Sequence, residues 1–273
     1  MTISGGIKFF KKSRSDIDDD NVIITASSGE ATKNNIRDRV RYLKWISIGS
    51  DDVTTETLEI DFGALYDIDR LLLVKHNFKN FQVEYDNSGW TDFANVVTKE
   101  GTQANIQETG NTKVNSYYEF DSVNTQKIRI SMDTTLVVDD EKELFEVVAT
   151  EEIGTFTGYP QNSQSFSRNA IRKQTARGRV KYSILDESYT TSLTFDKYPT
   201  AVDHTTVLTL WNDLKEFLIY PCGGNEDQFR FEEKGYRLED IYLVWFSDNF
   251  NPNYEQNVYV FGLNYTVALE ETA

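Results

Sequence analysis

Residues that carry enzyme chemistry are few in this sequence, and their spacing does not bring them together. The chain of 273 residues has one cysteine, Cys222, and two histidines, His76 and His204. A nucleophilic thiol needs a base beside it. Nothing in the spacing pairs Cys222 with a histidine, so a half-buried turn cysteine is the favoured interpretation. A single cysteine excludes an intrachain disulfide, and this set of Cys and His argues against a zinc site.

Carboxylates are abundant but show no catalytic or metal-binding pattern. Among 44 Asp and Glu some facing pair of the glycosidase type exists in any fold, and most acids alternate with apolar residues, as on solvent-facing strands. The acidic runs at 18–20, 51–52 and 139–141 lack the D-x-[DN]-x-[DN]-G spacing of a calcium loop. No G-x-S-x-G, P-loop or H-E-x-x-H motif occurs. We therefore predict no enzyme, no catalytic residues and no cofactor; a structural calcium is left open, and its ligands are unknown.

The charge distribution points to protein contacts rather than to nucleic acid. The net charge of −16 opposes binding to DNA or RNA, which requires cations to neutralise the phosphates. A basic strip of six cations nevertheless falls within fourteen residues that contain no acid: Arg168, Arg172, Lys173, Arg177, Arg179 and Lys181. The strip is either a solvated strand-and-loop face or a docking strip for an acidic surface, the same protein's own included. We predict that it is an assembly interface.

Aromatic residues are the remaining candidates for ligand contact. Three of the four tryptophans, Trp45, Trp211 and Trp245, lie in apolar patterns and are expected in cores. Trp90 follows the turn sequence NSG in a predicted loop. An exposed loop tryptophan can stack on a sugar or anchor a protein, and it can equally close over the end of a sandwich. Both interpretations stay open, and Trp90 is the predicted ligand contact.

The elements that must position such residues are mostly strands. Aromatic residues make up 13% of the chain and stand beside many Thr and Val, as on pleated, half-buried surfaces. Residues 1–21 are expected to form an N-terminal arm that cannot bury itself and that inserts Phe9 and Phe10 into a neighbour. Residues 22–152 form short apolar runs separated by turn sequences, as in a sandwich or barrel. Within them, TLEIDFG (57–63) alternates apolar and polar residues along one strand.

The second half of the chain adds a different pattern. Residues 153–178 contain glycines, a proline and the polar stretch QNSQSFSRNA, and are predicted to be a linker. Residues 179–273 resume the strand pattern, interrupted by one helix at 205–217 with Asp203 at its N-cap. The expected fold class is therefore mainly β: a β-sandwich followed by a second β-rich α+β domain with one helix.

Several sequence segments in the first half of the chain follow one another in the order found in a known family. They are the opening ITASSGEATKNNIRD, the W-x-S of Trp45 and Ser47, LEIDFG (58–63), IDRLLLVKHNFKNFQVEY, KIRI (127–130) and ELFEV (143–147). Together they resemble the galactose-binding-like, or discoidin (F5/8 type C), family. This resemblance implies a jelly-roll sandwich that binds glycans, lipid head groups or protein surfaces at the loops of one end, and often holds a structural calcium. Extracellular members often carry a disulfide that this chain lacks, which speaks against secreted adhesion.

The layout of the whole chain resembles structural proteins of tailed bacteriophages. An arm and a disulfide-free sandwich lead through EEIGTFTGYP into a second β-domain with LWNDLKEFLIYPCGG and a late D-x-x-x-P-N-Y (248–254). The resemblance implies a non-enzymatic virion subunit in a tail-associated ring or connection, made in the host cytoplasm. It would assemble with itself in a homo-oligomeric ring and with other virion proteins, through its arm and C-terminal domain, with the sandwich outside. The alternative is a carbohydrate-binding module or adhesin that contacts host glycans.

Membrane insertion is not expected. No segment approaches the roughly 18 consecutive apolar residues that a membrane helix needs. The N-terminal sequence has its charges after a short apolar run and no small-residue cleavage site, unlike a signal peptide. We expect a protein made and kept in a cytoplasm, or one that leaves it without a cleaved signal.

Overall fold

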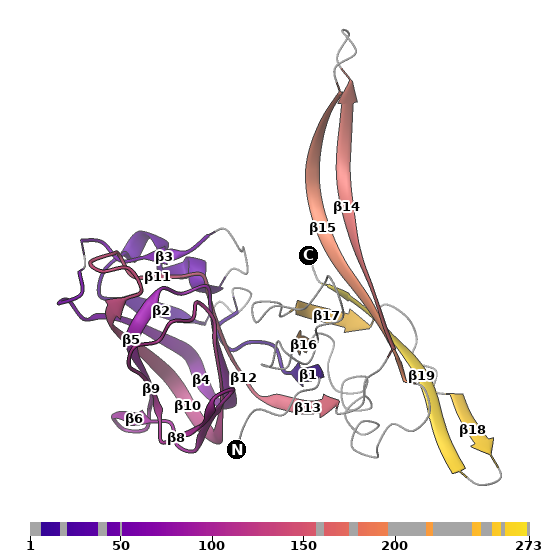
Figure 1. Cartoon of the computed structure of the whole chain (residues 1–273), viewed down its shortest axis with the longest axis horizontal. Coiled ribbons are helices and arrows are strands. Elements are labelled where there is room, and N and C mark those ends of the chain that lie inside the picture. Colours follow the sequence, from indigo (N-terminus) through magenta and orange to yellow (C-terminus); the bar gives the residue numbers. More distant parts are fainter. Residues whose placement is uncertain are drawn as a thin grey trace. The chain divides into compact units, whose positions relative to one another are not determined.

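The chain is mostly β and divides into two compact units (Figure 1). The first unit is built mainly from Phe10–Glu152, and the second mainly from Ile153–Ile219 and Tyr242–Ala273. The computed structural model describes the following residues: 7–16, 21–37, 43–49, 51–156, 161–174, 180–195, 217–220, 242–246, 253–257 and 260–271.

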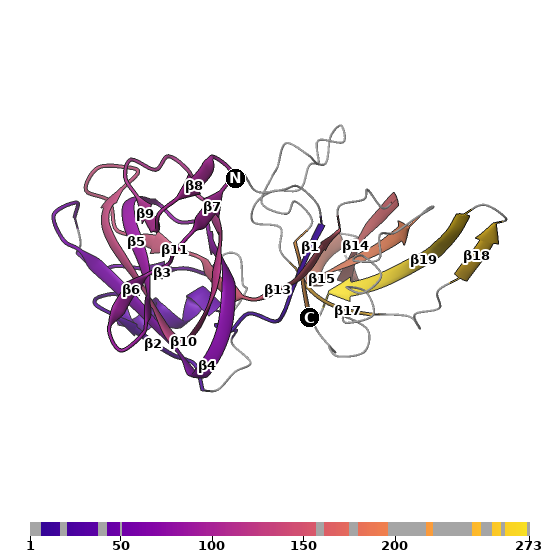
Figure 2. The same cartoon turned by 90° about the horizontal axis from the view of Figure 1, so that it is seen from below.

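The first unit is a jelly-roll β-sandwich in which two long strands belong to both layers. The first half of β4 (Glu56–Val74) pairs with β2 and with the second half of β10 (Ser116–Thr135), which also pairs with β5. The second half of β4 pairs with β12 and with the first half of β10, which contacts β7. The β4–β10 register shifts between Glu119 and Val123, where the sheet folds over its own core (Figure 2).

The remaining strands of this unit are short, as expected from the spacing of the turn sequences. They are β2 Ile23–Ala26, β3 Trp45–Ile46, β5 Phe78–Asp86, β6 Trp90–Asp92, β7 Val96–Thr98, β8 Gly101–Gln103, β9 Ile106–Glu108, β11 Glu143–Leu144 and β12 Glu146–Thr150. A 3₁₀ helix, η1 (Glu30–Arg37), lies between β2 and β3, within the piece ITASSGEATKNNIRD.

The core follows from the alternation of apolar residues along the strands. Leu58, Ile60 and Phe62 on β4 are fully buried, and the polar residues between them are partly exposed. This is the two-residue period of a strand with one face on a core, as the sequence predicts for 57–63. The stretch Leu71–Val74 is buried at every position. Burial of these side chains supplies most of the driving force for the sandwich.

The N-terminal segment does not form a free arm over its described part. Residues 7–10 form β1 (Ile7–Phe10), a strand of the second unit's sheet. The following residues run along β12, where Arg14 N donates to Ala149 O at 2.8 Å and Ser15 Oγ donates to Val147 O at 2.6 Å. The prediction of a free arm failed because this polar segment has no apolar pattern in the sequence. Hydrogen bonds from its backbone and hydroxyl groups hold it in place instead.

The second unit contains a sheet of eight described strands in the order β13-β1-β16-β17-β19-β15-β14, with β18 paired to β19. Their bounds are β13 Glu152–Phe156, β14 Gln161–Gln174, β15 Val180–Phe195, β16 Phe217–Tyr220, β17 Tyr242–Phe246, β18 Asn253–Asn257 and β19 Val260–Glu271. The stretch 153–178, predicted as a linker, thus contains most of β13 and all of β14. The sequence of β14 is mostly polar and shows no apolar alternation, so it did not predict a strand. The strand pairs with β15 through backbone hydrogen bonds.

Two further predictions concern the elements of the second half of the chain. The predicted helix at 205–217 lies outside the described residues except for Phe217, which begins β16. The strand pattern predicted to resume at residue 179 begins with one long strand, β15. No helix in the described ranges has the length and hydropathy of a membrane span.

Candidate functional site

A cavity of about 530 Å³ opens in the sandwich beside the β7–β8 hairpin. Its other walls are the end of β9, the start of β10 and the loop 109–115 between them. This volume is in the range of small-ligand sites, ~300–1,000 Å³. The residues that line it carry mainly amide, hydroxyl and charged groups, so it suits a polar ligand.

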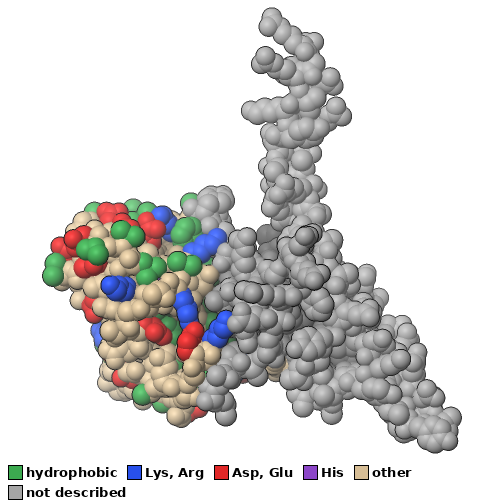
Figure 3. Space-filling model, viewed as in Figure 1, with side chains coloured by type: hydrophobic (Ala, Val, Ile, Leu, Met, Phe, Trp, Pro, Cys, Tyr) green, Lys and Arg blue, Asp and Glu red, His purple; other side chains and the backbone are tan. Residues whose placement is uncertain are grey.

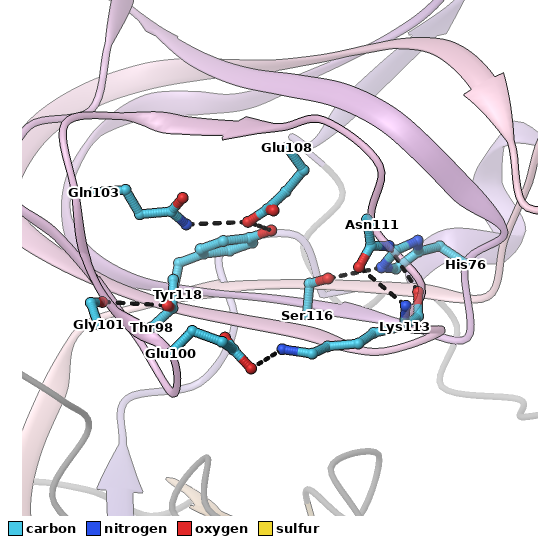
Figure 4. Close-up of polar contacts among 10 residues, drawn as sticks. All are labelled: His76, Thr98, Glu100, Gly101, Gln103, Glu108, Asn111, Lys113, Ser116 and Tyr118. Carbon is cyan, nitrogen blue, oxygen red and sulfur yellow. Dashed lines mark hydrogen bonds and ion pairs between the residues drawn. The ribbon is translucent and has the colours of Figure 1, made fainter.

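The inner wall carries a hydrogen-bonded group centred on Glu108 (Figure 4). The Tyr118 hydroxyl donates to Glu108 Oε1 at 3.1 Å, and Gln103 Nε2 donates to the same oxygen at 3.0 Å. Burial and the nearby Glu108 charge raise the pKa of Tyr118 well above its usual value. The tyrosine therefore stays protonated and keeps donating. Glu108 Oε2 has no hydrogen-bond partner among the described residues.

An ion pair joins the two walls at the outside of the cavity. Glu100, in the β7–β8 turn, pairs with Lys113 of the 109–115 loop (Figure 4). Partial burial works to raise the pKa of Glu100, but the hydrogen bond and charge of Lys113 outweigh it and lower that pKa. Both side chains are about half exposed, so the pair contributes little to stability. Its importance lies in its place beside the cavity.

The 109–115 loop is held by one asparagine. Asn111 Nδ2 donates to Phe78 O and to Lys113 O, each at 2.8 Å, and its Oδ1 accepts from Lys113 N at 3.0 Å. Gly110 has a φ of 73°, which favours glycine, and its N–H donates to Asn80 Oδ1 at 2.8 Å. These bonds fix the backbone of the cavity wall.

His76 supports the same wall from the core. Its ring is 1% exposed and stacks on Phe78, with 4.9 Å between centroids. Nδ1 accepts the Phe78 N–H at 3.2 Å, so Nε2 carries the hydrogen and donates to Ser116 Oγ at 2.9 Å. Burial lowers the pKa of His76 to about 3. The histidine is therefore neutral at ordinary pH and acts as a packing residue.

The predicted metal and ligand residues lie elsewhere. No group of three or more His, Cys, Asp or Glu within the described part of the chain is arranged to hold a metal. Trp90 lies on β6 and does not line the cavity. The guanidinium of Arg129 lies 4.3 Å from the Trp90 ring centroid and also donates to Glu84 Oε2 at 2.7 Å. One face of the tryptophan is thus covered, and its role as a ligand contact stays a prediction.

The predicted assembly residues fall into two groups. Phe9 and Phe10 are each 1% exposed within the chain itself, so insertion into a neighbour requires them to leave this position and stays a prediction. Arg168, Arg172 and Lys173 lie on β14. The last two residues of the predicted interface, Arg177 and Arg179, lie outside the described residues.

Sequence reasoning missed the cavity residues. The sequence E-T-G-N at 108–111 marks a turn, and the structure places its first residue, Glu108, on the cavity wall. Gln103 and Tyr118 come from strands 15 residues apart that only the folded register brings to Glu108. The turn sequence at 108–111 was the only local signal, and it indicates a turn rather than a ligand site.

Comparison with known proteins gives similarities of fold. The sequence matches no protein-family model and no curated protein. Chitosan-binding module 1 of a Paenibacillus sp. IK-5 chitosanase/glucanase has a TM-score of 0.41 and 14% identity, over 52% of this chain and 99% of that module. The family 32 carbohydrate-binding module of Clostridium perfringens NanJ, solved with galactose, has a TM-score of 0.39 and 15% identity, over 53% of this chain and 99% of that module. The functional assignment therefore rests on the cavity.

Proposed function

We propose that the first unit binds a carbohydrate in the cavity beside the β7–β8 hairpin. The observation that carries this proposal is Glu108. Its Oε1 is oriented by two donors, Tyr118 and Gln103, and its Oε2 has no partner among the described residues. An oriented carboxylate oxygen accepts a short, strong hydrogen bond from a hydroxyl. Sugars present hydroxyls as pairs, and the neighbouring amide of Gln103 suits a second one.

The other walls fit the same ligand. Thr109 and Thr112 also line the cavity, and their hydroxyls can both donate to and accept from the hydroxyls of a sugar. The volume of about 530 Å³ accommodates one or two sugar rings on the scale of known small-ligand pockets. A carbohydrate-binding module is the function that these groups support best.

The proposed activity is binding without hydrolysis. Glycoside cleavage needs a carboxylic acid that stays protonated to donate a proton to the leaving oxygen, with a second carboxylate opposite it. The pKa of Glu100 is lowered by Lys113, which is the opposite of what a proton donor requires. The buried His76, whose pKa is about 3, is neutral and contacts Phe78 and Ser116 rather than a ligand.

Isothermal titration of the full chain against a panel of neutral, amino and N-acetylated mono- and disaccharides tests the proposal. Glu108→Gln keeps the shape and an acceptor for Tyr118 but removes the charge, and we expect it to weaken binding at least tenfold. Trp90→Ala is the matched control and leaves affinity unchanged. Loss of binding in the Trp90 variant alone would move the site to β6. No binding to any sugar of the panel contradicts the proposal.

As a second candidate function we propose a structural subunit of a larger assembly, as the resemblance to phage tail proteins implies. The observation that favours it is the long antiparallel pair β14–β15, fourteen and sixteen residues in length. Extended hairpins of this kind present an unpaired edge to other chains. Electron microscopy of the purified chain tests this candidate: rings or tubes support it, and single particles at all concentrations contradict it.

A further inference from the structure

The end of the β14–β15 hairpin forms a two-stranded ribbon. β15 pairs with β19 only from Thr190 to Phe195. Between Val180 and Tyr189, its only partner among the described strands is β14, which has no other partner among them. Figure 1 shows this ribbon in the second unit. An isolated two-stranded hairpin is marginally stable in water, so the ribbon gains from a surface that covers it.

The ribbon is basic in an acidic protein. Its described residues, 169–174 and 180–185, carry Arg172, Lys173 and Lys181 and no acid, while the whole chain has a net charge of −16. Arg172 and Lys173 lie on β14, in register with Tyr182 and Lys181 of β15. Lys173 and Lys181 stand directly opposite each other, and like charges in that position destabilise a pair of strands. A surface rich in carboxylates suits it better.

Such a surface exists at one end of the sandwich, and two loops build it. They are residues 47–49 with 51–55, and residues 136–142 with the end of β10 from Asp133, and hydrogen bonds hold the two together. Thr135 N donates to Asp52 Oδ1 at 3.0 Å. Lys142, which is fully buried, donates through Nζ to Asp51 O at 2.6 Å and to Thr54 O at 2.8 Å. We call the joined pair the loop platform.

The loop platform exposes apolar and acidic side chains together. Val53 is 89% exposed, Val137 65% and Val138 72%. Hydrogen bonds from Thr54 and Thr135 lower the pKa values of Asp51 and Asp52, respectively, and keep both ionised. Its further acids are Asp133, Asp139, Asp140 and Glu141. Figure 3 shows green and red side chains gathered over the end of the sandwich that bears β3 and β11, which adjoin these loops. Exposed apolar residues rimmed by charge mark an interaction site.

We propose that the β14–β15 ribbon of one copy docks on the loop platform of a second copy. The complementary charges favour this partner, because the ribbon is the longest acid-free basic stretch of the chain and the platform's lysine is buried. The same two strands also carry Ile171, Ile184 and Leu185, apolar residues of the type that the exposed valines need as partners. The two surfaces differ, so the contact is head-to-tail and builds rings or filaments. The inference is independent of carbohydrate binding and gives the second candidate function its contact surfaces.

Light scattering of the full chain over a concentration series tests the docking, with two charge-reversed variants. Arg172→Glu with Lys173→Glu reverses the ribbon, and Asp140→Lys with Glu141→Lys reverses the platform. Like charges brought together at an interface weaken it strongly, so we expect each variant to need at least ~10-fold higher concentration to associate. An equimolar mixture of the two variants restores association, because each reversed surface meets a complementary one.

A second pair of substitutions serves as the control for the change in charge. Asp67→Lys with Asp121→Lys makes the same charge change at the opposite end of the sandwich and leaves association unchanged. Circular dichroism and carbohydrate binding of every variant show whether each still folds and whether the cavity is intact. The proposal is wrong if the wild type stays monomeric throughout, if the variants associate as the wild type does, or if the mixture stays apart.

Discussion

Tyr118 and Glu108 meet inside the first unit, with the tyrosine hydroxyl 3.1 Å from Glu108 Oε1. Tyr118 comes from β10 and Glu108 from β9, and the tyrosine is 2% exposed. This bond links the core of the sandwich to the wall of the cavity. It orients the carboxylate that the proposed sugar contacts.

Removal of the tyrosine hydroxyl tests that link. We expect Tyr118→Phe to lower the free energy of unfolding by about 1.5–3 kcal/mol, because the buried tyrosine loses its hydrogen bond to a charged carboxylate. Tyr85→Phe is the matched control, since the Tyr85 hydroxyl has no hydrogen-bond partner among the described residues, and we expect a change below about 0.5 kcal/mol. Urea denaturation measures both. Equal effects in the two variants would show that the Tyr118–Glu108 bond adds nothing.

Asn111 should act on the ligand more than on the fold. Asn111→Ala removes three hydrogen bonds that shape the 109–115 loop, so the free protein loses a preorganised wall and must order it on binding. We expect sugar affinity to fall several-fold while the melting temperature changes little. Asn87→Ala, in the exposed β5–β6 turn, is the control and should change neither quantity. A large drop in melting temperature for Asn111→Ala would make the residue a general stabiliser instead.

His76 predicts a loss of stability in mild acid. Its pKa is about 3 in the folded protein and about 6.5 in an unfolded chain. Between these values the unfolded chain binds the extra proton, so the free energy of unfolding falls as the pH drops below about 6.5. Denaturation at pH 7.5 and at pH 5 measures this fall, before most carboxylates titrate. We expect His76→Gln, which does not titrate, to be less stable at pH 7.5 but to show a flatter pH dependence. An equally steep dependence in the variant would assign it to other groups.

Gly29 supports the W-x-S motif. A Cβ at Gly29 would lie 2.0 Å from Ile46 O and 2.7 Å from Trp45 Nε1, and that indole nitrogen donates to Ser28 O at 3.0 Å. Gly49 has a similar positive φ, 66° against 69°, but open space around it. Both alanine variants carry the left-handed penalty of about 1–2 kcal/mol. Thermal denaturation should show the larger loss for Gly29→Ala, and equal losses would contradict the close contact.

The alternating strands were predictable because burial on one face imposes its period on the residues themselves. The alternation of Leu58, Ile60 and Phe62 with polar residues predicts a strand, and all three side chains are buried in the structure. β14 was not predictable in this way, since its polar residues are paired to β15 through the backbone. The sequence also could not show that residues 7–16 are built into strand β1 and along β12.

The cavity was less accessible to sequence reasoning for a related reason. Trp90 attracts attention as a loop tryptophan, but the β5–β10 register places Arg129 opposite Glu84 and over the Trp90 ring. Glu108 resembles many other acids until the pairing of β9 with β5 sets it opposite Phe81. A site assembled from long-range register leaves no local spacing to detect.

The most direct test of the carbohydrate site is an NMR titration of the isotope-labelled full chain with the best-binding sugar of the panel. We expect amide shift changes that saturate together at Gln103, Glu108 and the 109–118 segment, and that disappear in Glu108→Gln. Shift changes centred on Trp90 and β6, or none at saturating sugar, would contradict it.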